Sequence, residues 1–125
     1  MDNIAKMQAD DLIHQGLEFY QNHQFSQALQ TLQQALDLYR IIGDREWESN
    51  TLGTLGIIYY QLQDYPNAIA YSQQNLTIAR QLEDQWGETQ AWINLGNAYQ
   101  AQGNYGQALE CHQQSYDLRI DRITK

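Results

Sequence analysis

The sequence predicts an all-α protein built from three helix-turn-helix units, with about six antiparallel helices in all. Three observations lead to this fold class. Small residues recur at a fixed interval, apolar residues inside each repeat have helical spacing, and a chain-breaking pair divides the repeat. The repeats cover about residues 9–48, 49–88 and 89–125, and they are expected to form one domain over residues 1–125.

The interval between repeats is forty residues. The positions identical in all three repeats are Gly16, Gly56 and Gly96, then Ala28, Ala68 and Ala108, then the pairs Gln33-Gln34, Gln73-Gln74 and Gln113-Gln114. Such agreement is far beyond chance, so it indicates one structural unit repeated three times.

The first helix of each repeat is predicted around the repeated glycine. In the third repeat, the residues spaced at i, i+3, i+4 and i+7 are Trp92, Leu95, Gly96 and Tyr99. The matching residues of the second repeat are Leu52, Leu55, Gly56 and Tyr59. This spacing places the four residues on one face of a helix.

The second helix of each repeat follows a break. Gln63-Asp64 breaks the second repeat and Gly103-Asn104 breaks the third, and both Asp64 and Asn104 are good N-cap residues. Pro66, the only proline, then lies in the first helical turn, where its missing N–H costs little.

Residue size predicts how the paired helices pack. Gly96 on the first helix and Ala108 on the second are expected where the two helices approach closely, because a large side chain at either would push them apart. The aromatic residue after each break is expected to wedge between a pair and its neighbour. These aromatic residues are Phe25, Tyr65 and Tyr105.

Composition excludes several function classes. The net charge of −8 would repel a phosphate backbone, so nucleic acid is not an expected partner. Apolar runs are too short to span a membrane, and the N-terminus lacks the pattern of a signal peptide. A single cysteine, Cys111, forms no internal disulfide, which agrees with a reducing compartment and a cytoplasmic location.

The repeated residues resemble the tetratricopeptide repeat (TPR) family over about residues 9–122. The residues that carry the resemblance are Trp92, Leu95-Gly96, Tyr99, Tyr105 and Ala108. The resemblance implies a right-handed α-solenoid that binds proteins. The stretch from Asn94 to Tyr99, Asn-Leu-Gly-Asn-Ala-Tyr, is similar to the core of long repeats in bacterial TPR arrays and kinesin light chains.

Three features depart from the family pattern. The usual repeat has about thirty-four residues, and the extra residues here predict a longer second helix and hinge. Gln15 stands where leucine is expected, and Arg40 and Arg80 replace the proline that commonly closes a repeat.

The resemblance also implies a binding groove, because the first helix of each TPR unit lines the concave side. Register with the glycines assigns these groove residues: Asn94, Asn97, Asn50, Thr54, Tyr60, Tyr20 and His14. Asn94 and Asn97 are the main candidates, since an amide both donates and accepts hydrogen bonds to an extended peptide. Alternatively, the asparagines bond only within the helices, and the tyrosines pack only against neighbouring helices. The groove has no lysine or arginine, so an anionic C-terminus is a poor ligand.

No catalytic, metal or cofactor site is expected. Cys111 and His112 are adjacent, so they point about 100° apart on a helix and are poorly placed to share a metal. The sequence has no phosphate-binding glycine loop and no Ser-His-Asp constellation. Cys111 aligns with Thr31 and Tyr71, which predicts a small buried residue.

Three functions remain open on the sequence. The first is a non-enzymatic protein–protein interaction module that binds a partner peptide or helix in the groove. The second is a self-associating scaffold, a possible homo-oligomer, that stacks through an uncapped C-terminal repeat at Leu118, Ile120 and Ile123. The third is a regulatory fragment of a larger TPR protein.

Overall fold

The computed structural model describes residues 2–124, and every regular element in that range is an α-helix. The helices are α1 (Asp2–Gln21), α2 (Phe25–Ile42), α3 (Arg45–Gln61), α4 (Tyr65–Gln81), α5 (Gln85–Ala101) and α6 (Tyr105–Thr124). No helix in this range is long and apolar enough to cross a membrane.

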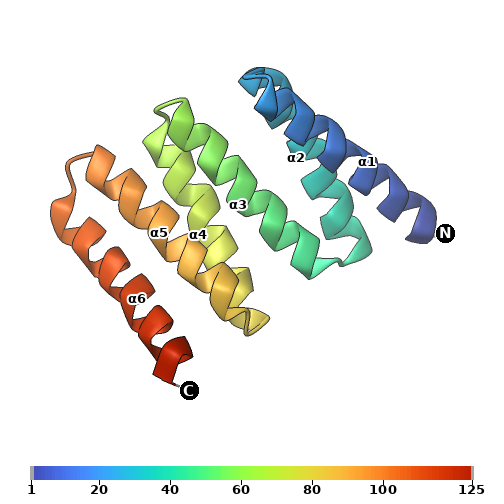
Figure 1. Ribbon diagram of the computed structural model, residues 1–125. Coiled ribbons are helices and arrows are strands. Elements are labelled where there is room, and N and C mark those ends of the chain that lie inside the picture. Colours follow the sequence, from blue (N-terminus) through green and yellow to red (C-terminus); the bar gives the residue numbers. More distant parts are fainter. Residues whose placement is uncertain (1, 125) are drawn as a thin grey trace.

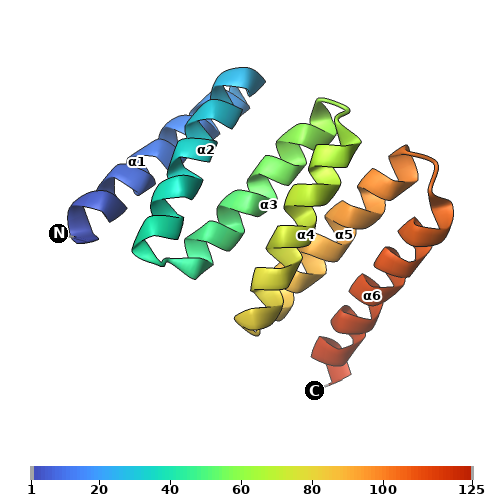
Figure 2. The ribbon, with the colours of Figure 1, turned by 180° about the vertical axis from the view of Figure 1, so that it is seen from behind.

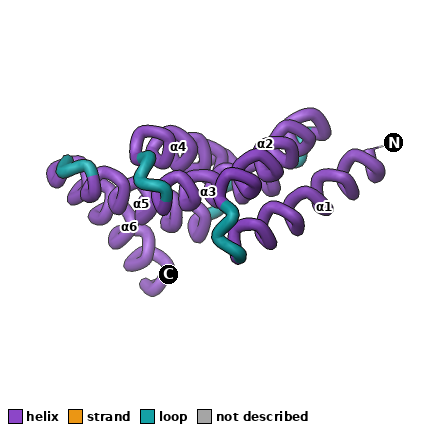
Figure 3. Tube along the Cα trace, turned by 90° about the horizontal axis from the view of Figure 1, so that it is seen from above, coloured by secondary structure: helices purple, strands orange, loops and turns teal. Residues whose placement is uncertain are grey.

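The helices form a row of three antiparallel pairs (Figure 1). The pairs α1–α2, α3–α4 and α5–α6 pack internally, while α2 contacts α3 and α4 contacts α5 at the junctions between pairs. The two ends of the chain lie at opposite ends of the row in Figures 1 and 2. Figure 3 shows that short turns are the only connections, so each pair contacts mainly its neighbours, as in a solenoid.

The turns between successive helices share one hydrogen-bond pattern. At the first turn His23 N–H donates to Tyr20 O, and Gln24 N–H donates to Phe19 O; the same two bonds recur at each later turn of residues 2–124. This is the Schellman motif, in which one residue adopts a left-handed backbone. The left-handed residues are His23, Gly43, Gln63, Glu83 and Gly103. Only two of them are glycine, so the turn geometry repeats more regularly than the turn sequence.

Aspartates mark the starts of three helices. The carboxylates of Asp44, Asp64 and Asp84 accept backbone N–H groups at the starts of α3, α4 and α5. Gln24 occupies the same position before α2 and makes no side-chain cap. The second and third pairs therefore begin at residues 45 and 85, ahead of the repeat boundaries expected at 49 and 89. The repeat period gives the spacing of the units, whereas the caps decide where a helix begins.

The repeated glycines lie where the paired helices approach most closely. A Cβ added at Gly16 would lie 2.6 Å from Leu32 Cδ2, and one added at Gly96 would lie 2.7 Å from His112 Cε1. At Gly56 the corresponding neighbour is Ser72 Oγ, at 2.8 Å. The expected close approach is therefore present in all three pairs.

The aromatic residues after the breaks do not all wedge between pairs. The ring of Phe25 lies 5.9 Å from Tyr20, and that of Tyr65 lies 5.7 Å from Tyr60. Tyr105, in contrast, is 69% exposed, so the expectation of a wedge at this position was wrong. The described residues place no helix beyond α6 against which its ring would pack.

The hydrophobic core is divided into two unequal clusters. The larger cluster fills the first two pairs, with Leu32, Leu36, Leu52 and Ile58 fully buried. The smaller cluster lies among α4, α5 and α6 and contains only Leu76, Ala91, Leu95 and Cys111 as buried members. The third pair therefore has less apolar packing than the other two.

Ion pairs between half-exposed arginines and the glutamates Glu48 and Glu88 lie at the junctions between helical pairs. Arg40 Nε lies 3.2 Å from Glu48 Oε2 and Arg45 Nη1 lies 3.0 Å from Glu48 Oε1, although Glu48 is only 6% exposed. Arg80 and Glu88 repeat this pairing at the next junction, also at 3.2 Å. The arginines that replace the closing proline thus connect each repeat to the following helix, and the Glu48 side chain is buried although it lies in the first turn of α3.

Gly16→Ala is expected to lower the free energy of unfolding by about 1–3 kcal/mol, because the new methyl group meets the buried side chain of Leu32. The matched control is Gly106→Ala, whose Cβ meets nothing within 4 Å. It should be neutral or stabilising by up to about 1 kcal/mol, since alanine favours a helix. Urea denaturation followed by circular dichroism measures both. Equal effects of the two substitutions would contradict the proposed role of the glycine column.

Glu48→Gln should lower the free energy of unfolding by about 1–2 kcal/mol, because two arginines lose their ionic partner at a buried position. Glu88→Gln is the matched comparison. Glu88 pairs with one arginine and its side chain is 19% exposed, against 8% for Glu48. The loss there should be smaller. Thermal unfolding at neutral pH ranks the two, and a larger loss for Glu88→Gln would refute this explanation.

Candidate functional site

Four hollows follow one another along the face formed by α1, α3 and α5, called here the α1–α3–α5 face. Their volumes are about 50 Å³ beside α1, 210 Å³ and 250 Å³ between α3 and α5, and 380 Å³ near the end of α5. Neighbouring hollows share residues: Asn50 and Thr54 line the first two, Asn94 the middle two, and Tyr60 and Asn97 the last two. The hollows therefore form one continuous groove.

Asn94 and Asn97 lie at the middle of this groove, on the side of α5 that faces α3. Both side chains are half-buried. Among the hydrogen bonds of residues 2–124, none uses either side-chain amide. The alternative in which these asparagines bond within or between helices therefore has no support in the structure. Each leaves a donor and an acceptor available to a ligand.

Asn50, Thr54 and Tyr60 line the groove from α3. The Thr54 hydroxyl donates to the backbone oxygen of Asn50 at 3.1 Å, and the Asn50 residue is exposed. Tyr60 packs edge-on against Tyr65 but remains 38% exposed. The ring of Tyr60 therefore packs against Tyr65 and also borders the groove, while its contact with a ligand stays a prediction.

Tyr20 and His14 lie outside the hollows. The Tyr20 hydroxyl accepts a hydrogen bond of 3.0 Å from Gln61 Nε2, and its ring packs against Phe25. Tyr20 therefore joins α1 to α3, and the packing alternative describes it better. His14 is exposed on α1 and lines none of the four hollows. Both residues lie on α1, as register with the glycines predicts, and a binding role for them stays a prediction.

Trp86 is a groove residue that the sequence analysis missed. It lies in the first turn of α5, is 60% exposed and lines the same hollow as Asn50 and Asn94. The Arg122 guanidinium stacks over its ring at 5.1 Å. Trp86 aligns with Glu46 in the preceding repeat, so a search limited to repeated residues passes over it. The sequence signal for Trp86 is this difference itself, because a large aromatic residue stands where the preceding repeat has an acidic one.

The groove carries little charge. Within the described part of the chain, its lining includes one ionisable carboxylate, Asp84, and no lysine or arginine. The Asp84 carboxylate already caps α5 through Gly87 N–H. Residues 2–124 also hold no group of three or more histidine, cysteine, aspartate or glutamate side chains that could bind a metal ion. The arrangement is suited to hydrogen bonding and apolar contact.

The residues expected to mediate self-association do not share a face of α6. Leu118 is half-buried and lies on the inner side with Ala108 and Cys111, whereas Ile120 and Ile123 are 39% and 79% exposed. Ile120 and Ile123 instead continue a stripe of exposed apolar residues on α6. This α6 stripe consists of Tyr105, Leu109, Tyr116, Ile120 and Ile123.

Solved structures of several organisms have the same arrangement of helices. BtubC (BKLC) from P. vanneervenii is 23% identical with a TM-score of 0.88, and the match covers 94% of this chain and 48% of that one. The TPR domain of Arabidopsis FLU is 23% identical with a TM-score of 0.82, covering 96% and 98%. The N-terminal domain of stress-induced protein-1 (STI-1) from C. elegans is 15% identical with a TM-score of 0.80, covering 97% and 98%. These similarities confirm the predicted right-handed α-solenoid and say nothing further of activity.

Sequence comparison identifies the family directly. No curated protein matches the chain significantly. The family model described as the tetratricopeptide repeat matches residues 16–81 and again residues 47–121. The two matches overlap and together extend over most of the chain. The forty-residue repeats, the paired helices and this match lead to one conclusion: the chain belongs to the tetratricopeptide repeat family.

Proposed function

We propose that the chain is a non-enzymatic protein-interaction module that binds an extended segment of a partner protein in the groove of the α1–α3–α5 face. Modules of this fold serve in general as protein-interaction domains or scaffolds. The observation that carries the proposal is the pair of unbonded amides of Asn94 and Asn97, half-buried at the junction of three hollows. An extended backbone offers the donors and acceptors that these amides need.

Aromatic and charge features define what the groove would bind. Trp86 and Tyr60 lie at either end of the middle hollows and supply apolar contact area, as aromatic residues often do at interfaces. The lack of lysine and arginine in the lining, and the net charge of −8, disfavour an acidic segment. We therefore expect a neutral or basic partner segment with at least one apolar side chain.

Replacing Asn94 and Asn97 by alanine together should weaken peptide binding about tenfold or more, because two hydrogen bonds to the ligand backbone are lost. The ligands for this test are peptides selected on the wild-type protein from a displayed library of random twelve-residue sequences. Isothermal titration calorimetry gives the dissociation constants. The selected peptides should contain few aspartates and glutamates.

The matched control is Gln30→Ala together with Gln34→Ala, which removes two exposed amides from α2, away from the groove. This control should bind every selected peptide with unchanged affinity. Circular dichroism should show that both double variants keep the wild-type helix content. Selected peptides that bind the Asn94/Asn97 variant as well as they bind the wild type would overturn the groove proposal.

The α6 stripe favours a second candidate function, self-association. Its five residues are spaced four, seven, four and three positions apart, so they follow one side of the helix. Exposed apolar stripes of this kind mark interfaces. In a longer array, the following helical pair would cover the same stripe.

Replacing Ile120 and Ile123 by glutamate should shift a concentration-dependent dimer to monomer and weaken dimerisation at least tenfold, since both exposed side chains become charged. Sedimentation equilibrium from micromolar to millimolar concentration measures this. Ile41→Glu is the control, because Ile41 is 78% exposed on α2, far from the stripe. A wild-type chain that stays monomeric throughout the range would refute self-association.

A further inference from the structure

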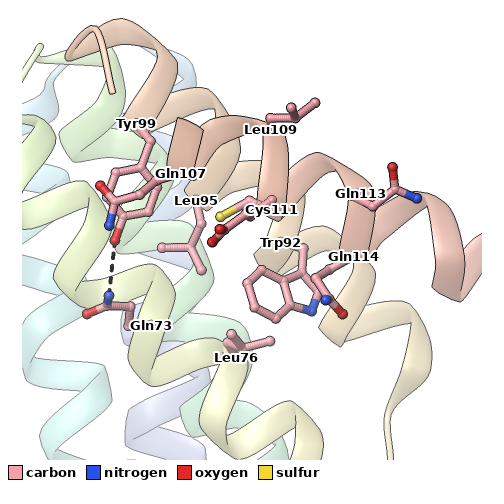
Figure 4. Close-up of a pocket in the computed structure, with 11 residues that line it drawn as sticks. Gln73, Leu76, Trp92, Leu95, Tyr99, Gln107, Leu109, Cys111, Gln113 and Gln114 are labelled. Carbon is pink, nitrogen blue, oxygen red and sulfur yellow. Dashed lines mark hydrogen bonds between the residues drawn. The ribbon is translucent and has the colours of Figure 1, made fainter. Parts of the chain in front are cut away.

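A cleft with a volume of about 600 Å³ opens on the other side of α5, between α4 and α6 (Figure 4). Its floor is apolar and includes Leu76, Trp92, Leu95 and Cys111, and glutamines surround its mouth. The α5 residues that line it are Trp92, Leu95 and Tyr99, which lie opposite Asn94 and Asn97 on the helix. This cleft is therefore separate from the groove of the α1–α3–α5 face.

The preceding junction shows what fills the equivalent space. There Tyr71 of α4 crosses α3 toward α2, and its ring stacks on Tyr59 with centroids 5.3 Å apart and planes 14° apart. Its hydroxyl donates to Gln33 Oε1 at 3.1 Å. Tyr71 is half-buried and packs against the larger core cluster. One phenol ring thus closes the space between the second helices of adjacent repeats.

The junction between the second and third pairs has residues equivalent to the partners of Tyr71 but no aromatic residue at the position equivalent to Tyr71 itself. Forty residues on, Tyr59 becomes Tyr99 and Gln33 becomes Gln73, both of which line the cleft. Tyr71 becomes Cys111, whose short side chain leaves the space between α4 and α6 open. Figure 4 shows the Cys111 side chain between Tyr99 and Trp92, with Gln73 below Tyr99.

The hydrogen-bonding groups of the cleft correspond to those around Tyr71 at the preceding junction. Gln73 Nε2 donates to the Tyr99 hydroxyl at 3.4 Å, and within residues 2–124 no hydrogen bond uses Gln73 Oε1. That oxygen corresponds to Gln33 Oε1, the acceptor of the Tyr71 hydroxyl. A phenol stacked on Tyr99 would find both an aromatic surface and an acceptor for its O–H.

We propose that the cleft between α4 and α6 binds a tyrosine side chain of a partner protein, stacked on Tyr99 and donating its hydroxyl to Gln73, in the place that Tyr71 fills at the preceding junction. The volume is that of a ligand pocket and exceeds the space of one ring, so residues flanking the tyrosine also fit. The amides of Gln107 and Gln114, which also line the cleft, suit the backbone of such a segment, whereas the Gln113 amide already donates to Asp117. This site is independent of the groove proposal, since it lies on the other side of α5.

The probes are the capped tripeptides Gly-Tyr-Gly, Gly-Phe-Gly and Gly-Leu-Gly, together with 4-methylphenol, which is the free tyrosine ring. Binding is followed through the backbone amide NMR signals of Leu76, Tyr99 and Cys111. The tyrosine peptide should bind at millimolar concentration, severalfold more tightly than the phenylalanine peptide, which lacks the hydroxyl. It should also slow alkylation of the Cys111 thiol by iodoacetamide, because the thiol lies on the floor of the cleft.

Two substitutions of Cys111 test whether binding depends on the open space of the cleft or on the thiol group. Cys111→Tyr should fill the cleft as Tyr71 does, weaken binding of the tyrosine peptide at least tenfold and raise the melting temperature. Cys111→Ala keeps the space open and should bind like the wild type. Tyr71→Cys should create a second site, reported by the amide signal of Tyr59. If Cys111→Tyr does not fold, Cys111→Leu supplies the filled cleft.

Four outcomes would overturn the proposal. The first is that no probe shifts the three amide signals. The second is that the filled variant binds the peptide as well as the wild type does. The third is binding of 4-methylphenol without the tyrosine peptide, which would assign the cleft to a small phenol. The fourth is a change of these signals with protein concentration alone, which would assign it to a second copy of the chain.

Discussion

The close approach of the paired helices at Gly16, Gly56 and Gly96 is the constraint on which the rest of the structure depends. A Cβ at any of them would lie less than 3 Å from a side chain of the paired helix. The contact occurs at the same point in every repeat, so corresponding residues of α1, α3 and α5 lie at the same level along the helix axes. The continuous groove from Asn50 to Tyr60 and Asn97 follows from this regularity. The glycines also bring the second helices close enough to stack behind the first.

Repetition made the fold predictable, and it also limited what could be predicted of the site. The forty-residue interval and the helical spacing around Gly96 were enough to predict six paired helices. The helix starts at residues 45 and 85 follow from the caps of Asp44 and Asp84, which themselves recur at the forty-residue interval. Asn94 and Asn97 lie in the groove as expected, while their role in binding stays a prediction. The hydrogen bond that the Tyr20 hydroxyl accepts from Gln61 joins two repeats, and register alone cannot reveal such a contact.

The features that the sequence pattern did not reveal lie mainly at residues that differ from one repeat to the next. Trp86 replaces an acid and borders the groove, and Cys111 replaces a tyrosine and opens a cleft. The buried carboxylate of Glu48 pairs with the half-exposed Arg40, an arrangement that a count of charges does not reveal. In a repeated architecture the shared residues maintain the stack. The unshared residues give each junction its own shape and chemistry.

The unequal division of the core has a consequence for how the molecule opens. In a solenoid each unit is held mainly by its immediate neighbours, so local opening free energies follow local packing. The first two pairs share one large apolar cluster, whereas the cluster among α4, α5 and α6 has four buried members and borders an open cleft. We therefore expect local unfolding to begin at α6, while the first two pairs remain folded. A molecule that fills the cleft would raise the free energy of local unfolding of α6 and so order that end of the array.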